Sequence, residues 1–150
     1  MPNTAANNCT DASVSVASED QWLHVVAGVI FNTAGDAILL ARRPSNKHQG
    51  DKWEFPGGKV EAGESAELAL SRELEEELGI RPDSAALAPF IEVRHRYPNK
   101  NIFLDVWLVS NFSGEPYGRE GQAVRWFALH ELSTLEFPEA NAPILEKLVF

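Results

Sequence analysis

Gly58–Ile80 reads GKVEAGESAELALSRELEEELGI, and its second half has the residue spacing of an amphipathic helix. Ser65 is a candidate N-cap, and Gly79 stands where a C-terminal cap belongs. Three leucines recur at i, i+4 and i+8 and should face a core: Leu70, Leu74 and Leu78. The segment is therefore predicted to form a loop, a helix and a second loop.

The predicted helix carries a cluster of acidic side chains on one face. Glu73, Glu76 and Glu77 fall beside the leucines, where like charges repel and the C-terminal helix dipole disfavours anions. Arg72 can relieve part of this repulsion through an i, i+4 contact with Glu76. Two interpretations remain open: a solvated acidic face with ion pairs, or a site for a hard cation such as Mg²⁺ or Mn²⁺.

The full spacing of the segment, G-x5-E-x7-R-E-L-x-E-E-x-G-I, matches the Nudix box without a departure. From about Leu23 to Leu148 the chain resembles the MutT-type 8-oxo-dGTP diphosphatases of the Nudix hydrolase superfamily. This resemblance implies a metal-dependent hydrolase that converts 8-oxo-dGTP to 8-oxo-dGMP and pyrophosphate. Such an enzyme would sanitise the nucleotide pool and so prevent mutation during DNA replication.

The rest of the chain alternates extended stretches with polar turns. Apolar patterns predict strands at residues 23–31, 37–42, 86–97, 101–112 and 123–129. The sequence WEFPGG at 53–58 predicts a short extended piece, and a second short helix is expected from about Asn141. Two helices among strands, without regular βαβ alternation, indicate the α/β class. Together with the resemblance, this predicts an α/β/α sandwich around a central mixed sheet.

Length and composition indicate one compact domain. The chain has 150 residues, of which 44% are hydrophobic, and we expect a flexible polar tail at 1–20 followed by a Nudix domain at 21–150. The net charge of -9 makes nucleic acid a poor partner, because phosphates would be repelled. The single cysteine, Cys9, cannot form an internal disulfide. Without a signal peptide or a bilayer-spanning run, the sequence predicts a cytoplasmic monomer with no membrane partner.

The resemblance also implies a metal site and a catalytic group. Its metal ligands are Glu73, Glu76, Glu77, Glu120 and the Gly57 carbonyl. The metal would be Mg²⁺, with Mn²⁺ able to substitute. Water would attack the β-phosphorus, with Glu73 as the first candidate for general base and Glu120 as its rival. Arg72 would hold the carboxylates in register, and Glu77 completes the expected catalytic group.

Nucleotide contacts are implied by four further segments that resemble the same subgroup: ARR with the loop after it, WEFPGGK, GEPYGREGQ and EFPEANAPILEKL. The implied contacts are Arg43, His48, the backbone of Glu54, Phe55, Pro56 and Gly57, and Asn141. In the turn PNK, Lys100 replaces the arginine that this subgroup often has. Lysine keeps the charge but lacks the planar fork of arginine, so a role for Lys100 stays open.

Several of these residues have ordinary structural explanations. Glu120 and His48 lie in polar loops, where exposed side chains are common, and Arg43 is also explained as a solvated charge at a strand end. Asn141 precedes two residues typical of a helix start, so it could simply cap the last helix. Its amide can also read a purine edge, because oxidation at C8 turns guanine N7 from an acceptor into a donor.

Alternatives for the function remain at two levels. Other Nudix hydrolases cleave ordinary dNTPs, ADP-ribose or dinucleoside polyphosphates, and the box reports only the phosphate chemistry. A binding module that senses a nucleotide without cutting it is the second alternative. Such a module could dispense with the box glutamates, and here none is missing.

Overall fold

The computed structural model describes residues 21–47 and 50–149. The predicted tail at 1–20 and His48 lie outside the described residues. The strands are β1 (Leu23–Ile30), β2 (Ala37–Arg42), β3 (Trp53–Glu54), β4 (Gly57–Lys59), β5 (Arg81–Pro82), β6 (Leu87–Tyr97), β7 (Lys100–Val109), β8 (Phe112–Ser113) and β9 (Val124–Ala128). The helices are α1 (Ala66–Leu78) and α2 (Ala142–Val149), with 3₁₀ turns η2 (Ser84–Ala86), η3 (Leu129–Thr134) and η4 (Glu139–Asn141).

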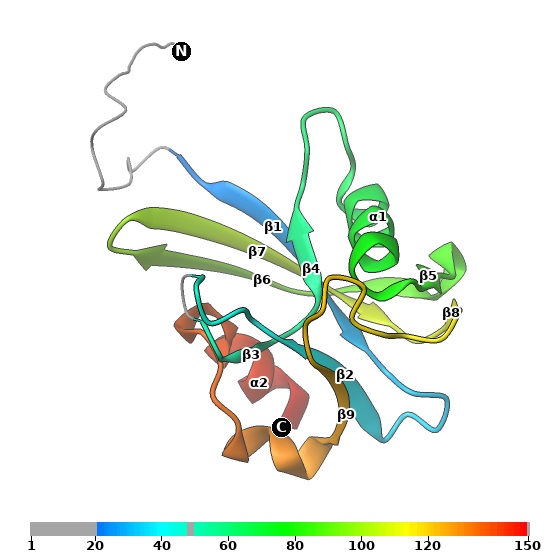
Figure 1. Cartoon of the computed structure of the whole chain (residues 1–150). Helices are drawn as coiled ribbons and strands as arrows, with labels where there is room; N and C mark the ends of the chain where they lie inside the picture. Colours follow the sequence, from blue (N-terminus) through cyan, green and yellow to red (C-terminus); the bar gives the residue numbers. More distant parts are fainter. Residues whose placement is uncertain (1–20, 48–49, 150) are drawn as a thin grey trace.

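A four-stranded mixed sheet with the order β4–β1–β7–β6 lies at the centre of the fold. β1 and β7 are parallel, whereas β1 pairs with β4, and β6 with β7, in the antiparallel sense. A second sheet has the order β3–β2–β9, and β5 pairs with β8. Figure 1 shows α1 on one side of the strands and α2 on the other. The predicted sandwich around a mixed sheet is confirmed.

Strand β1 is buried on both faces, which explains its nearly unbroken apolar sequence. Successive side chains of a strand point to opposite faces. Val26 and Ile30 pack with the leucines of α1, whereas Ala27 and Val29 belong to the core that also contains Ile144 of α2. Helix α1 therefore packs on one face of β1, and α2 joins the core on the opposite face of that strand.

Helix α1 begins and ends at the two predicted caps. The Leu68 N–H donates to Ser65 Oγ over 3.2 Å, and Gly79 adopts the left-handed conformation with φ of 71°. The three predicted core leucines, Leu70, Leu74 and Leu78, are fully buried. The acidic face is thus fixed in rotation about the helix axis by the packing of the opposite face.

Three predicted boundaries are corrected by the structure. WEFPGG forms two strands rather than one piece, because β3 pairs with β2 while β4 pairs with β1. The strand predicted at 101–112 ends at Val109, since Phe112 and Ser113 pair with β5 instead. The last helix starts at Ala142, after the 3₁₀ turn that contains Asn141. Within the described residues, no helix has the length and apolar content needed to cross a bilayer.

Candidate active site

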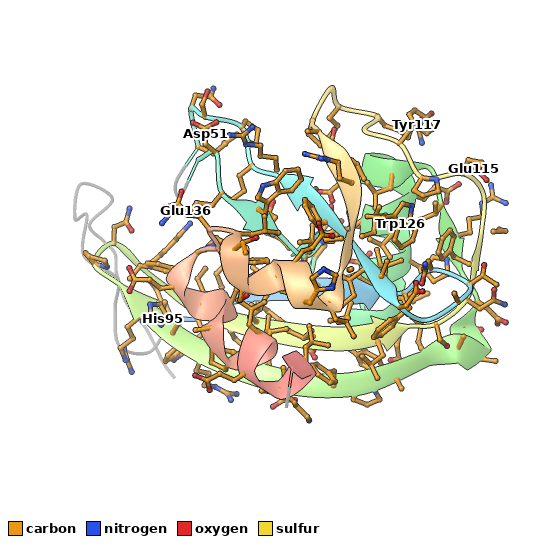
Figure 2. The ribbon with its side chains drawn as sticks, turned by 90° about the horizontal axis from the view of Figure 1, so that it is seen from below. Asp51, His95, Glu115, Tyr117, Trp126 and Glu136 are labelled. Atoms are coloured by element: carbon orange, nitrogen blue, oxygen red, sulfur yellow. The ribbon has the colours of Figure 1, made fainter. Side chains whose placement is uncertain are left out.

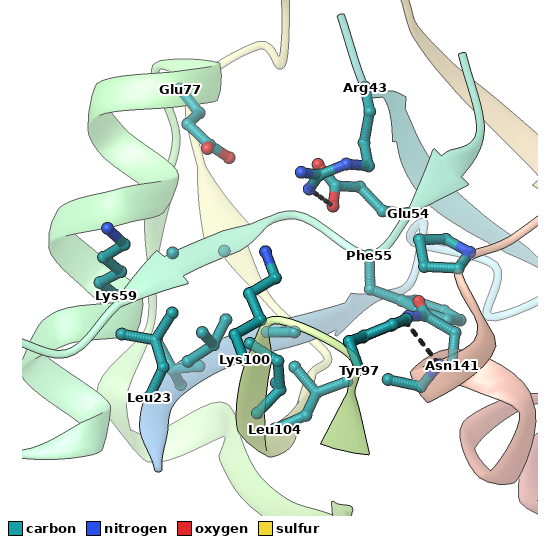
Figure 3. Close-up of a pocket in the computed structure, with 18 residues that line it drawn as sticks. Leu23, Arg43, Glu54, Phe55, Lys59, Glu77, Tyr97, Lys100, Leu104 and Asn141 are labelled. Carbon is teal, nitrogen blue, oxygen red and sulfur yellow. Dashed lines mark hydrogen bonds and ion pairs between the residues drawn. The ribbon is translucent and has the colours of Figure 1, made fainter. Parts of the chain in front are cut away.

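A pocket of about 280 Å³ opens between α1, the β3–β4 segment and the turn before α2 (Figure 3). Its polar lining comes from Arg43, Glu54, Lys59, Glu77, Lys100 and Asn141. Its floor is apolar and includes Phe55, Ile102 and Leu104. Charged groups at one end and an amide over an apolar floor at the other suit a ligand with an anionic part and a ring.

Glu77 points from α1 into this pocket (Figure 3). Burial raises the pKa of its carboxyl to about 8, and the negative charges of Glu73, Glu54 and Glu120 add to the effect. A hydrogen bond from the backbone of Gly57 acts in the opposite direction. The carboxyl therefore lies in a place where its charge is poorly compensated by the protein itself.

Glu73 lies one helical turn before Glu77 and is packed against the chain at Gly58. A Cβ built on Gly58 would stand 2.2 Å from the Glu73 carboxyl carbon, and one on Gly57 would stand 1.9 Å from the Val26 carbonyl oxygen. At position 57 only glycine fits, because the chain there approaches the backbone of β1, whereas a side chain at position 58 would push the Glu73 carboxylate aside. Burial also raises the pKa of Glu73, although Arg72 opposes this shift.

Arg72 binds three glutamates at once. Its Nε and Nη2 donate to the two oxygens of Glu64 over 2.7 and 2.9 Å, and its Nη1 donates to Glu73 over 3.0 Å. The predicted i, i+4 contact with Glu76 is present at 3.3 Å. Arg72 holds the pKa of Glu64 down at about 2. Glu76 is largely exposed, so this face of the helix divides into two inward glutamates and one outward glutamate.

Glu120 comes from the loop before β9, which closes the C-terminal end of α1. The Arg119 backbone N–H donates to the Glu77 carbonyl over 3.0 Å, and the Arg119 guanidinium donates to the Glu75 carbonyl over 2.9 Å. Gln122 accepts from the Glu120 N–H and donates to the Glu77 carbonyl. The bonds to Glu77 satisfy a helix carbonyl that would otherwise lack a donor, whereas the Glu75 carbonyl also accepts from the Gly79 N–H. They also hold Glu120 near the acidic face of α1.

A second hollow, of about 300 Å³, joins this loop to the pocket. Arg43, Glu54 and Glu77 line both hollows, while Glu120 lines only the second. The candidate site therefore extends continuously from Asn141, past Glu77, to Glu120.

Cationic side chains from three separate elements face the same pocket. Arg43 follows β2 and donates to Glu54 over 2.7 Å, Lys59 ends β4, and Lys100 begins β7 (Figure 3). Burial lowers the pKa of Lys100, and the positive charges of Arg43 and Lys59 lower it further. Because Arg43 and Lys59 are close enough to repel the charge of Lys100, an anion bound among the three side chains would interact with all of them.

Asn141 lies at the other end of the pocket and is only 7% exposed. The turn that carries it rests on Tyr97, whose hydroxyl accepts from the Ala140 N–H over 3.1 Å. Asn141 ends η4 rather than standing free before the last helix, and its own N–H donates to the Pro138 carbonyl. A buried amide over an apolar floor is suited to recognise the polar edge of a planar ring.

The comparison with protein families decides what this arrangement belongs to: a model described as NUDIX domain matches residues 26–147. The chain belongs to the Nudix family. It is 42% identical over 126 residues to an 8-oxo-dGTP diphosphatase of Escherichia coli (strain K12), covering 84% of this chain and 95% of that protein. It is also 38% identical over 127 residues to a CTP pyrophosphohydrolase of the same organism, covering 84% of this chain and 90% of the relative.

A solved structure from a study of MutT from Aliivibrio salmonicida and Vibrio cholerae is similar throughout the Nudix domain. The TM-score is 0.75 at 43% sequence identity, and the match covers 86% of this chain and 98% of the other. The fold and the family expected from the box are thus confirmed.

Nudix hydrolases generally need a divalent metal, and the donor set of this Nudix box fits one. The crowded groups are carboxylates, whose oxygens are the ligands that hard cations prefer. Burial, and then the charges of the neighbouring carboxylates, raise the pKa of Glu77. The charged form of this carboxyl is therefore disfavoured unless a cation compensates it. Within the described residues, no group of three histidine, cysteine or acidic side chains is arranged to hold a metal ion by itself. Mg²⁺ needs only a few carboxylates, because it completes its shell with water and phosphate oxygens.

The sequence did not predict two polar residues that line the pocket of this Nudix domain, and it left the role of a third undecided. Tyr97 and Lys59 line the pocket, and Lys100, which stayed open, lines it too. Lys59 lies inside the box, so its position next to the glycines was a usable signal. Tyr97 had no such signal, because its contact with Ala140 joins residues 43 positions apart.

Proposed function

We propose that this Nudix protein hydrolyses 8-oxo-dGTP to 8-oxo-dGMP and pyrophosphate, using Mg²⁺, with Mn²⁺ able to substitute. The observation that carries the proposal is one pocket that joins the Glu77 carboxyl, a group of cations and the buried Asn141 amide. The name of the Escherichia coli relative, 8-oxo-dGTP diphosphatase, supports the choice of substrate.

The triphosphate is assigned to the end of the pocket where the charges gather. Arg43, Lys59 and Lys100 would bind phosphate oxygens, each from a different element. The bond from Arg43 to Glu54 helps to orient the guanidinium at the edge of the pocket. The lowered pKa of Lys100 is relieved when an anion arrives among these cations.

The residues that would hold the metal are Glu73, Glu76, Glu77, Glu120 and the Gly57 carbonyl. A divalent cation there would neutralise phosphate charge and make the attacking water more acidic. Glu73 is the first candidate to accept the proton of that water, and Glu120 is its rival. Arg72 keeps Glu73 in position through its bond to that carboxylate, and its bond to Glu76 holds Glu76 outward. Glu76 would therefore need to turn from Arg72 to join the inward pair.

The base is assigned to the apolar end of the pocket, near Phe55 and Asn141. The Asn141 carbonyl oxygen would accept from N7–H of the oxidised base, whereas N7 of normal guanine would present an acceptor to it. The wrong base would leave buried polar groups without partners, so a large difference in kcat/KM is attainable. The backbone from Glu54 to Gly57 would supply the remaining contacts. His48 keeps its expected role as a nucleotide contact.

Product analysis with 8-oxo-dGTP, dGTP and CTP in Mg²⁺ tests this proposal. We expect the highest kcat/KM for 8-oxo-dGTP, and pyrophosphate rather than orthophosphate as the product. In H₂¹⁸O the label should enter pyrophosphate, since the proposed attack is at the β-phosphorus. Label in the monophosphate, or equal kcat/KM for oxidised and normal dGTP, would contradict the proposal.

A second candidate is the hydrolysis of CTP, because one relative at 38% identity is named CTP pyrophosphohydrolase. The phosphate end of the pocket would serve either substrate, so the difference lies at Asn141. Preference for CTP in the same panel would select this alternative. The cytoplasmic location, the monomeric state and the absence of nucleic-acid or membrane partners stay predictions.

A further inference from the structure

The turn that carries Asn141 rests on a side chain of β6, which comes much earlier in the sequence. Tyr97 is the last residue of β6, is 7% exposed, and lines the pocket with its ring. Its hydroxyl oxygen accepts from the Ala140 backbone N–H over 3.1 Å, and this bond is buried (Figure 3).

This bond meets a need that η4 cannot satisfy by itself. The first N–H groups of a helical turn have no carbonyl partner within the turn. The Ala140 N–H is one of these groups in η4, and the Tyr97 hydroxyl accepts from it. The same three-residue turn ends in Asn141. Its backbone position, and with it the origin of the Asn141 side chain, is therefore fixed by the Tyr97 oxygen.

A second residue of β6 supports the same turn from outside the pocket. The ring of His95 contacts Tyr97 edge to face, with 4.5 Å between ring centroids. Its Nε2 lies 3.8 Å from a carboxylate oxygen of Glu139. His95 and Tyr97 are two residues apart on β6, so both side chains lie on the same face of the strand. Strand β6 thus sets the location of η4 through these two side chains.

We infer that Tyr97 is a positioning residue for base selectivity: its hydroxyl holds η4 so that the Asn141 amide meets the edge of the oxidised base. The inference rests on the proposed function, in which Asn141 reads that edge. The ring and the hydroxyl of Tyr97 then have different roles. The ring belongs to the pocket wall, and the hydroxyl acts through the backbone of Ala140.

Tyr97→Phe tests this role, because the substitution keeps the ring and removes only the hydroxyl. We expect the ratio of kcat/KM for 8-oxo-dGTP to that for dGTP to fall about two- to tenfold, which is the worth of one hydrogen bond. The rate with dGTP should change little. Tyr117→Phe is the matched control, since Tyr117 is 57% exposed and lies at the far end of the molecule from His95 (Figure 2).

The double variant with Asn141→Ala shows whether the hydroxyl acts through Asn141. If it does, adding Tyr97→Phe to Asn141→Ala lowers the selectivity ratio no further. A ratio unchanged in Tyr97→Phe, or equal losses with both substrates together with a lower Tm, overturns the positioning role. Wild-type protein without a preference for 8-oxo-dGTP overturns the proposed function, and the positioning role with it. A clear wild-type preference that is unchanged in size in Tyr97→Phe overturns the positioning role alone.

Discussion

At the scale of single residues, the site is built from groups that the fold itself does not favour. Glu77 is surrounded by Glu73, Glu54 and Glu120, and burial together with these charges raises its pKa to about 8. A carboxyl in such a place binds a proton at neutral pH unless a cation takes the proton's place. Arg72 is bound to other glutamates and so compensates only part of this charge.

Glu77→Gln should therefore separate activity from stability. The folded pKa of about 8 lies above the ordinary value of 4.5, so the folded state binds more protons between these limits. Stability of the metal-free wild type should fall as pH rises through that window, by about 2 to 4 kcal/mol at pH 8. The variant should lack this decline, while its kcat with Mg²⁺ falls at least about 100-fold.

Thermal denaturation in EDTA between pH 5 and pH 8 measures the difference. Glu76→Gln is the matched comparison, because Glu76 is exposed and paired with Arg72. Its stability curve should run parallel to that of the wild type. If the stability curve of Glu77→Gln also ran parallel to that of the wild type, the ionisation of Glu77 would not destabilise the folded protein as predicted.

At the scale of secondary-structure elements, α1 and the loop before β9 act as one unit. The helix has no basic residue in its last turn, and the loop supplies donors to its terminal carbonyls instead. The side-chain amide of Gln122 is used in both directions: its oxygen accepts from the Glu120 N–H, and its NH2 group donates to the Glu77 carbonyl. A helix cap thereby also places an acidic residue in the site.

Gln122→Ala should loosen Glu120 without removing it. Losing two hydrogen bonds should cost about 1 to 3 kcal/mol of stability, and kcat should fall about tenfold. Both kcat and the urea midpoint should be measured, alone and in a Glu120→Gln background. If the loop acts by placing Glu120, the two losses of activity should not add. Additive losses would instead assign Gln122 a role independent of Glu120.

Arg72→Lys tests whether the fork of the guanidinium organises the box. Lysine keeps the charge but cannot bind Glu64 with two N–H groups while also reaching Glu73. We expect kcat to fall about 10- to 100-fold and Tm to decrease. Arg81→Lys is the matched control, because Arg81 is exposed and pairs with Glu75 outside the site. Equal effects of the two substitutions would deny Arg72 a special role.

At the scale of the whole molecule, the structural features that the sequence predicted depend on residues close together in the chain. The features that it did not predict depend on contacts between residues far apart in the chain. The caps of α1, its buried leucines and the contact of Arg72 with Glu76 all depend on residues within one helix. The two sheets, the separation of β3 from β4 and the support of η4 by Tyr97 depend on distant partners. Periodicity in a single sequence carries no record of such pairings. The resemblance to the Nudix box supplied the site residues that periodicity could not.

The packing of α1 on β1 makes the charge cluster a property of the folded state, so metal binding should stabilise the whole domain. A ligand that binds only folded protein adds about 2.7 kcal/mol at one hundred times its Kd. We expect the Tm of wild type to rise with MgCl₂ beyond a NaCl control of equal ionic strength, and to rise less in Glu77→Gln. Since ligand carboxyls must lose protons, the increment should grow with pH up to about 8, the pKa of Glu77. A Tm that follows ionic strength alone would mean that the acidic cluster holds no cation in the free protein.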